Sequence, residues 1–192
     1  KMATAVMPYY TISYEQDTKN GENVGNAYNK YLITDLLRGK YGYDGVVCTD
    51  WGITGDAPNV YEFRGKPWGV ENLSVAERHY KIIEAGCDQF GGNNDMGPVI
   101  EAYQMGVEEH GEEYMRKRFE TSAVRLLKNI FRTGLFENPY LDVAQTEKIV
   151  GNSEFMEAGY NAQLKSIVML KNNEKTLPVE NKKKVYVPQR YV

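Results

Sequence analysis

The chain has 192 residues, of which 42% are hydrophobic, and a formal charge of -3 at pH 7. This is enough for one large domain, or for one domain with a piece of a second. The longest basic cluster is Lys182–Lys184 and other charges are interspersed, so nothing indicates a nucleic-acid or anionic-membrane partner. No apolar run approaches the ~20 residues that a bilayer span needs.

The start of the chain carries a further expectation. It opens on Lys1-Met2-Ala3 and moves directly into a strand-like segment. No signal peptide, with its charged and apolar regions, is recognisable there. We therefore expect a fragment of a longer protein.

The first predicted element is a strand over Thr4–Tyr10, with Pro8 near its end, where a ladder hydrogen bond can be spared. A polar loop rich in glycine and asparagine follows over Ser13–Asn26. A helix that ends at Gly39 comes next, because apolar residues recur there at helical spacing. These residues are Tyr28, Tyr31, Leu32, Leu36 and Leu37.

The stretch Gly42–Gly52 contains a short β-branched apolar run between glycines, which predicts a buried strand. Alternation places Cys48 and Asp50 on one face of it. Ligands gather at the carboxyl ends of parallel strands in α/β folds, so Asp50, at the end of this strand, is the candidate site residue. The structural alternative is that Asp50 caps the next element. Trp51 offers a flat apolar face and an N–H donor, which suits a sugar ring.

A segment rich in glycine, proline and aromatic residues lies between Asp50 and Ser74. It is too long for a simple connection, and such loops in compact domains are usually functional or disordered. Its aromatic residues are Tyr61, Phe63 and Trp68. Of these, we assign Trp68 to substrate binding, on the same aromatic rim as Trp51.

The residues after this loop predict a helix and a third strand. Ser74–Glu77 has the pattern of a capping box, so a helix begins at Val75 and ends before Gly86. The short apolar segment Gly86–Phe90, which runs into a turn-rich stretch, predicts the strand.

Two further helices follow. One runs from Pro98 to about His110, and the other ends at Gly134. The second carries the clearest apolar stripe of the chain, which we interpret as core packing. The stripe consists of Met115, Phe119, Ala123, Leu126, Leu127, Ile130 and Phe131.

The pattern then lapses into a proline-containing linker over residues 135–152, which predicts a domain boundary. The predicted organisation is a first domain over residues 1–134, the linker, and the start of a second domain over residues 153–192.

In the second domain, Ser153 is expected to cap a helix that runs through Leu170. A short strand, Val185–Val187, follows before any sheet can form. The side of the helix predicted to be buried consists of Phe155, Ala158, Ala162, Ile167 and Val168.

The alternation of strands and helices up to residue 134 predicts part of a parallel α/β domain, either a barrel or an open sheet. Three strands cannot close a barrel. We therefore expect the remainder of a parent chain, or a partner copy, to complete the fold.

A carboxylate at a strand end can serve as a nucleophile, a general base, a metal ligand or a cap. As the nucleophile of a glycosidase, Asp50 needs a second carboxyl group ~5 Å away. As an aspartyl-phosphate nucleophile it would begin the sequence Asp50–Thr54, but Gly52 stands where phosphatases of the haloacid dehalogenase type have a second acid. The candidate second carboxyl groups are loop acids more simply explained as solvated: Glu15, Asp56, Glu62, Glu71 and Asp95.

Other site chemistries find no support in the sequence. His79 and His110 lie in predicted helices without ligand spacing, so both are expected at the surface and no metal site is predicted. No serine or cysteine triad and no phosphate-binding glycine loop can be assembled. Cys48 and Cys87 are expected to be free, buried thiols. We therefore expect neither a metal nor a cofactor.

Several sequence blocks together resemble glycoside hydrolase family 3. The most specific is Gly42–Trp51, which follows Lys30–Gly39. The resemblance covers essentially the whole chain, because further blocks agree in the same order. These are Glu84–Asp88, Val124–Leu127, Gly134–Tyr140, Ser166–Asn172 and Leu177–Pro178.

The resemblance implies a retaining, exo-acting, β-glucosidase-like enzyme. Asp50 would attack the anomeric carbon of the sugar to form a covalent glycosyl-enzyme, which water then hydrolyses. Trp51 would line the sugar subsites. Tyr10, at the end of the first strand, would correspond to the tyrosine that lies close to the nucleophile. Tyr9 is a competing assignment, because this chain has two tyrosines where the family more often has Ser-Tyr.

By the same resemblance, the chain would comprise the C-terminal part of a (β/α)8-type barrel, the linker, and the first elements of an α/β sandwich. The barrel strands that grip the sugar and the usual acid/base region would lie outside it, so the isolated chain should be nearly inactive. The substrate would be a β-linked oligosaccharide or glycoside, and the location periplasmic or secreted. Two other classes stay open: a non-catalytic carbohydrate-binding or scaffold fragment, and an aspartyl-phosphate phosphatase-like enzyme.

Overall fold

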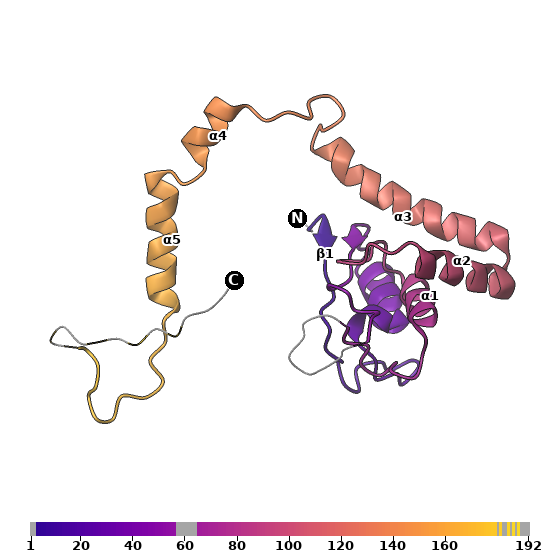
Figure 1. The fold of residues 1–192 in the computed structure, drawn as a ribbon, viewed down its shortest axis with the longest axis horizontal. Coiled ribbons are helices and arrows are strands. Elements are labelled where there is room, and N and C mark those ends of the chain that lie inside the picture. The colour runs from indigo at the N-terminus through magenta and orange to yellow at the C-terminus, as the bar shows by residue number, and fades with distance from the viewer. Residues whose placement is uncertain are drawn as a thin grey trace. The chain divides into compact units, whose positions relative to one another are not determined.

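The structure, a computed structural model, describes residues 3–56, 65–179, 181, 184, 186 and 188 (Figure 1). Internal contacts divide the chain into two compact units, Lys1–Pro139 and Tyr140–Val192. The division falls inside the segment 135–152, which the sequence predicts to be a linker. The assignment of the units to a barrel domain and a sandwich domain stays a prediction.

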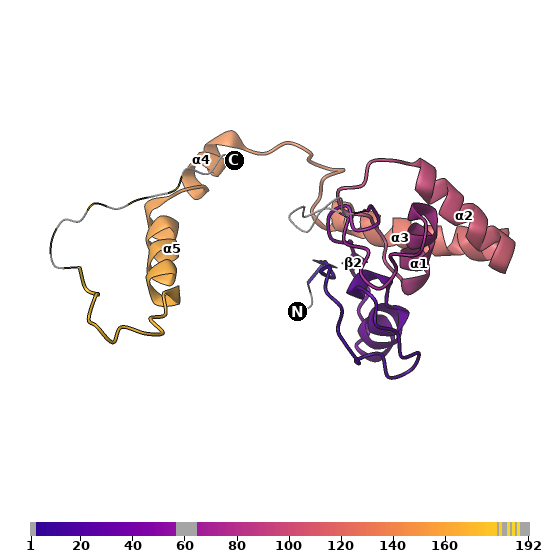
Figure 2. The ribbon, with the colours of Figure 1, turned by 60° about the horizontal axis from the view of Figure 1, so that its bottom comes forward.

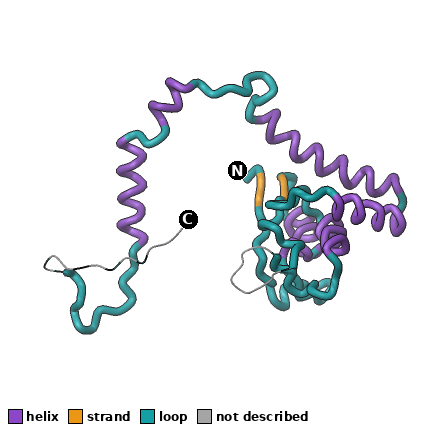
Figure 3. Tube along the Cα trace, viewed as in Figure 1, coloured by secondary structure: helices purple, strands orange, loops and turns teal. Residues whose placement is uncertain are grey.

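Three extended segments of the first unit lie side by side and run in parallel. β1 (Ala5–Val6) pairs with β2 (Val46–Val47), and a parallel bridge joins Cys48 to Gln89. Figure 3 shows β1 and β2 next to each other. The first two predicted strands are thus confirmed but shorter than expected, and the third contributes only a bridge. Strand pairing is limited to residues that have a neighbouring extended segment within this chain: β1 with β2, and Cys48 with Gln89.

Helical segments connect these extended segments. Between β1 and β2 lie a 3₁₀ turn, Asn26–Tyr28, and a π-helix, η2 (Tyr31–Lys40). α1 (Val75–Ala85) connects β2 to the bridge. The helix predicted to end at Gly39 is therefore present, but it is a π-helix and extends to Lys40. Parallel strands joined by helical crossovers are the α/β pattern that the sequence predicts.

The ends of α1 are fixed by its own sequence. The Ser74 hydroxyl accepts a hydrogen bond from the Glu77 N–H at 3.2 Å, and the Glu77 carboxylate accepts one from the Ser74 N–H at 2.7 Å. The predicted capping box is therefore confirmed. At the other end, Gly86 has φ of 105°, and a Cβ there would lie 2.5 Å from the Thr34 hydroxyl. Only glycine fits this close approach without a shift.

Two apolar clusters form the core of the first unit. The first surrounds β2 and the inner sides of η2 and α1. The second joins α1 to α2 (Gly97–His110) and α3 (Glu112–Arg132), which lie together in two views (Figures 1 and 2). The buried members of the first are Val24, Ala27, Tyr28, Ile33, Tyr43, Val47, Ile53, Val70, Ile82 and Cys87, and those of the second are Ile83, Ala102 and Met115.

The apolar stripe of α3 is buried only near its start. Met115 is fully buried and Phe119 packs edge-on against Tyr103, with ring centroids 5.2 Å apart. Leu127 and Phe131, however, are 43% and 60% exposed, so the prediction that the whole stripe is core is wrong. α3 has 21 residues and its neighbour α2 has 14, so about 10 Å of α3 extends beyond what α2 can cover.

The second unit contains α4 (Val143–Ile149), inside the predicted linker, and α5 (Ser153–Ser166). The cap of α5 is Asn152 rather than Ser153, because the Asn152 side chain accepts the Phe155 N–H at 2.9 Å. The helix ends at Ser166, before the predicted Leu170.

No residue of α5 is buried within the described part of the chain, so the prediction of a buried side is wrong there. Phe155 is 59% exposed, because the structure supplies no surface against which it could pack. Val185 and Val187, of the predicted strand Val185–Val187, lie outside the described residues. None of the described helices combines the length and apolar character that a membrane crossing requires.

Candidate active site

The ends of the three parallel segments lie at one edge of the first unit. Tyr10 follows β1, Asp50 follows β2, and Gly91 follows the bridge at Gln89. The Gly52 N–H donates to the Gly91 carbonyl at 2.9 Å, which joins the last two loops. This edge is the usual place for a ligand site in an α/β fold.

Asp50 is half-buried at this edge, and its Oδ1 accepts a hydrogen bond from the Trp51 N–H at 2.7 Å. Its neighbours follow the predicted alternation near the strand end: Thr49 is fully buried, whereas Cys48 is half-buried. In the described residues after Asp50, the first helix begins at Val75 and has its own cap, Ser74. The structure therefore does not use Asp50 as a helix cap.

Tyr10 lies next to Asp50. Its hydroxyl donates to the Trp51 carbonyl at 2.6 Å. Burial, followed by the negative charge of Asp50, raises the pKa of Tyr10 to about 12. At neutral pH, Tyr10 is thus an uncharged hydroxyl beside a carboxylate. The competing residue, Tyr9, is 53% exposed, and no contact places it at Asp50 among the described residues.

The Trp51 side chain is 56% exposed, and its indole lies against Gly91 and Gly92. A Cβ added to Gly92 would lie 2.5 Å from the indole Cδ1, and one added to Gly91 would lie 2.7 Å from Cε3. The two glycines are therefore needed for the ring to lie where it does. The exposed remainder of the ring is a platform of the kind that suits a sugar.

Two buried side chains hold the turn that follows Trp51. The Tyr28 hydroxyl donates to the Ile53 carbonyl at 3.0 Å, and the guanidinium of Arg78 donates to the Thr54 carbonyl at 3.0 Å. Both donors are at most 2% exposed. Sequence reasoning missed these roles, because Tyr28 belongs to a helical stripe and Arg78 to a surface-like helix pattern. Together with Tyr10, they fix the backbone on which Asp50 and Trp51 are carried.

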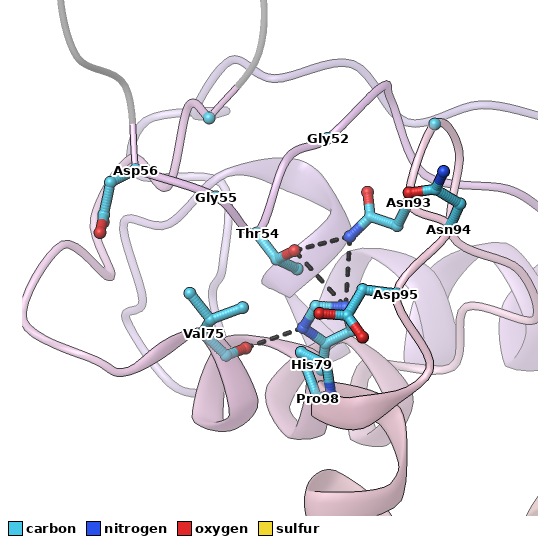
Figure 4. Close-up of a pocket in the computed structure, with 12 residues that line it drawn as sticks. Gly52, Thr54, Gly55, Asp56, Val75, His79, Asn93, Asn94, Asp95 and Pro98 are labelled. Carbon is cyan, nitrogen blue, oxygen red and sulfur yellow. Dashed lines mark hydrogen bonds between the residues drawn. The ribbon is translucent and has the colours of Figure 1, made fainter.

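A cavity of about 390 Å³ opens between this turn and residues 92–98 (Figure 4). His79, which lines it, is 1% exposed, so its predicted surface position is wrong: its ring packs on Phe90, with centroids 4.4 Å apart. Its Nδ1 lies 2.8 Å from the Val75 carbonyl and therefore carries the proton. Its Nε2 then accepts from the Asn93 amide at 3.2 Å. His110, by contrast, is exposed as predicted.

The burial of His79 makes the stability of the fold depend on pH. Burial lowers the pKa of His79, against smaller opposing effects of the Val75 hydrogen bond and the Asp95 charge. Below about pH 6.5, the unfolded chain therefore binds this proton more readily than the folded chain. We expect the free energy of unfolding to fall as the pH drops from 7 to 5, and to fall less in His79→Gln. Urea unfolding at several pH values measures this free energy. The same dependence of the free energy of unfolding on pH in the wild type and in His79→Gln would contradict the expectation.

The remaining predicted residues are distributed as follows. Trp68 is 40% exposed, and its carbonyl accepts the Gly25 N–H at 2.9 Å. The described lining of the cavity at His79 contains neither Trp68 nor Asp50, Trp51 or Tyr10. Of the loop acids, Asp56 and Asp95 line that cavity, whereas Glu62 lies outside the described residues.

The structure also shows how the possible metal ligands and the two cysteines are arranged. Among the described residues, no group of three or more His, Cys, Asp or Glu side chains could hold a metal ion. Cys48 and Cys87 are both free. Cys87 is buried, as predicted, and burial raises the pKa of its thiol to about 12, whereas Cys48 is only half-buried because it lies on the Asp50 side of the strand.

A buried ion-pair cluster lies behind β2. The side chain of Asp88 is 0% exposed, and its Oδ2 accepts the Val47 N–H at 3.0 Å and Arg38 at 2.6 Å. Its Oδ1 accepts Arg125 at 3.0 Å and the Ser122 hydroxyl at 2.8 Å. This cluster, which sequence reasoning also missed, ties the strand that ends at Asp50 to η2 and α3. The sequence signal that could have indicated a buried ion pair is the position of Asp88, an acid inside the apolar strand-like segment Gly86–Phe90.

Comparison with known proteins gives a consistent set of relatives. No protein-family model matches the chain. It is 40% identical to the periplasmic beta-glucosidase/beta-xylosidase of Dickeya chrysanthemi over 96% of the chain and 29% of that protein. It is also 40% identical to beta-glucosidase C of Emericella nidulans over 92% of the chain and 27% of that protein. The chain thus spans less than a third of the length of these relatives.

Solved structures of beta-glucosidases also match the chain. A beta-glucosidase from Listeria innocua in complex with gluconolactone matches with a TM-score of 0.58 and 25% identity, over 81% of this chain and 20% of that one. A beta-glucosidase from Erythrobacter marinus matches with a TM-score of 0.52 and 26% identity, over 80% of this chain and 18% of that one.

Proposed function

We propose, from the premise that this chain belongs to glycoside hydrolase family 3, that its parent protein is a retaining, exo-acting β-glycosidase and that Asp50 is its nucleophile. The substrate is a glycoside or oligosaccharide with a terminal β-linked sugar. The observation that carries the proposal is the position of Asp50. It lies half-buried at the carboxyl end of β2, close enough to the neutral hydroxyl of Tyr10 to raise its pKa, and it directly precedes Trp51, which is 56% exposed.

In the proposed reaction, a carboxylate oxygen of Asp50 attacks the anomeric carbon and the glycosidic oxygen leaves with a proton from a second carboxyl group. Water then hydrolyses the glycosyl-enzyme ester and restores the carboxylate. Tyr10 donates to the Trp51 carbonyl and so fixes the turn beside the nucleophile. It also offers an uncharged hydroxyl next to the Asp50 carboxylate. Trp51 supports the apolar face of the sugar.

The second carboxyl group is proposed to come from outside this chain, as are the side chains that grip the sugar hydroxyls. Less than a third of each curated relative is covered, and the remainder of the parent chain would supply the rest of a (β/α)8-type barrel and of an α/β sandwich. We therefore propose that the isolated chain is inactive or nearly so.

The stereochemical outcome tests this function directly. The complete parent protein is incubated with an aryl β-glucoside, and proton NMR records which anomer of the free sugar appears first. A two-step displacement through Asp50 gives the β-anomer first. If the α-anomer appears first, the covalent mechanism is wrong.

The packing of the Trp51 indole against Gly92 leads to a second prediction, about catalytic efficiency. In Gly92→Ala, the new Cβ collides with the indole, and φ of 66° strains any residue with a side chain. Displacement of the ring should lower kcat/KM of the parent protein on an aryl β-glucoside roughly 10- to 100-fold. Gly21→Ala is the matched control, because Gly21 has φ of 70° but no atom within 4 Å of the added Cβ. Equal kinetics of the two variants would contradict a role for Trp51.

The proposed location of the parent protein is outside the cytoplasm, periplasmic or secreted. The support is the name of the Dickeya chrysanthemi relative, which is described as periplasmic. The two other classes, a non-catalytic carbohydrate-binding fragment and an aspartyl-phosphate phosphatase, gain no support from the relatives, which are named as glycosidases. Turnover of β-glycosides by the parent protein would exclude the first. Mg²⁺-dependent hydrolysis of phosphate esters would favour the second.

A further inference from the structure

The turn that supports the Trp51 indole has few backbone contacts of its own. Gly91 is anchored at its N–H, which donates to the Thr49 hydroxyl at 2.9 Å, and at its carbonyl, which accepts a backbone N–H at 2.9 Å. Beyond it, no backbone–backbone hydrogen bond holds residues 92–95 within the described part of the chain. The position of Gly92, against which the indole lies, therefore depends on side chains.

The Asn93 side chain supplies this support. Its amide nitrogen donates to the Thr54 hydroxyl at 2.8 Å and to Nε2 of His79 at 3.2 Å, and both partners are at most 1% exposed (Figure 4). Its Oδ1 is buried and has no hydrogen-bond partner among the residues that the structure describes. The amide is therefore held through its nitrogen, by these two acceptors.

The His79 ring is oriented to be one of the two acceptors. Its Nδ1 donates to the Val75 carbonyl at 2.8 Å, one helical turn earlier, which leaves Nε2 unprotonated. The ring also packs on Phe90, the residue before Gly91, with centroids 4.4 Å apart. Both the tautomer and the orientation of the ring are thus fixed. A chain of contacts runs from α1 through Asn93 to the turn under the indole.

We propose that His79 is a positioning residue of the candidate active site: through Asn93, it keeps the turn under Trp51 in place. It acts through this turn rather than by contact with the sugar. The inference rests on the proposed function, since it explains how the platform for the substrate is held. A buried histidine of α1 thereby contributes to substrate binding as well as to the packing of the core.

The test uses steady-state kinetics of the complete parent protein with an aryl β-glucoside. His79→Asn keeps a donor near the Val75 carbonyl but is too short to reach Asn93. It should lower kcat/KM about tenfold, as expected for the loss of a buried hydrogen bond, with a rise in KM of about threefold or more. Misfolded molecules lower kcat and leave KM unchanged. The rise in KM therefore separates a displaced platform from a loss of folded protein.

Two further histidine variants give the rescue and the control. In His79→Gln, the side-chain oxygen can take the place of Nε2 and accept the Asn93 amide, so kcat/KM should stay within about threefold of the wild type. His110→Asn is the matched control, because His110 is an exposed histidine of α2. Its loss should leave kcat and KM at their wild-type values.

A double-mutant cycle tests the route through Asn93. Asn93→Ala should lower kcat/KM at least as much as His79→Asn, because it also removes the contact to Thr54. The double variant His79→Asn/Asn93→Ala should be no slower than Asn93→Ala alone, since His79 then has no contact left through which to act on the turn. Losses that multiply in the double variant would overturn the inference.

The outcomes separate this inference from the proposed function. If the wild type hydrolyses the aryl glucoside but His79→Asn keeps kcat/KM within about twofold of it, or if His79→Gln loses as much as His79→Asn, the positioning role is overturned and the function stands. If the wild type does not hydrolyse the aryl glucoside, the proposed function fails and the inference fails with it. Should His79→Asn not fold, the half-buried Asn93 decides the matter: wild-type kcat/KM in Asn93→Ala would overturn the inference.

Discussion

Replacement of Asp50 by alanine in the complete parent protein is expected to reduce turnover of an aryl β-glucoside on the order of 10⁴-fold or more. The reason is that the variant lacks the carboxylate that is proposed to form the covalent intermediate. Steady-state kinetics with the purified variant measures the loss. The fold should survive, because Asp50 is only half-buried and accepts one hydrogen bond, from the neighbouring Trp51 N–H.

Chemical rescue separates a missing nucleophile from a damaged site. Azide is small enough to enter the space that the Asp50 carboxylate vacates, and it should restore part of the turnover of Asp50→Ala with an α-glycosyl azide as product. Glu71→Gln is the matched control, since Glu71 is an exposed acid of the same loop region and its loss should leave turnover near the wild-type value. A comparable loss in both variants would count against Asp50 as the nucleophile.

Replacement of Asp88 by asparagine is expected to destabilise the first unit by about 3–5 kcal/mol, the cost of breaking a buried ion pair from one side. Asp88 is the acid that faces Arg38, Arg118 and Arg125, at 2.6, 3.8 and 3.0 Å. Its removal would leave three largely buried guanidinium groups without this counter-charge. Asparagine also has one donor group where Asp88 has only acceptors.

The measurement for Asp88→Asn is the urea midpoint of the parent protein, with soluble yield as a second readout. Asp44→Asn is the matched control: Asp44 pairs with Arg125 at 3.6 Å and with Lys128 at 2.5 Å, but its side chain is 65% exposed. An exposed pair of this kind contributes about 0–1 kcal/mol. Equal midpoints for the two variants would show that the Asp88 cluster does not stabilise β2.

The parts of the site that could be predicted are those governed by local pattern. Strand alternation and the glycine-bounded apolar run place Asp50 and Trp51 at a strand end, and the structure has them there. The capping box predicts the start of α1 to the residue. These features depend on neighbours within a few positions, so one sequence is enough to find them.

The parts that could not be predicted depend on distant partners. His79 resembles a surface histidine in its own helix, and only the loop that carries Asn93 and the ring of Phe90 bury it. Arg78 likewise finds its acceptors 7 to 24 positions away in the sequence. The apolar stripe of α3 predicts a buried face. Phe131 is nevertheless exposed, because α2 is shorter than α3, and the stripe itself does not contain the length of the neighbouring helix.

The central claim is that Asp50 becomes covalently bonded to the sugar. Incubation of the complete parent protein with a 2-fluoro β-glycoside slows hydrolysis of the intermediate, so that the labelled peptide can be isolated and sequenced by mass spectrometry. The account predicts that the sugar is attached to Asp50, in the peptide that contains Val46–Trp51. A label on any other carboxylate of the protein would contradict it.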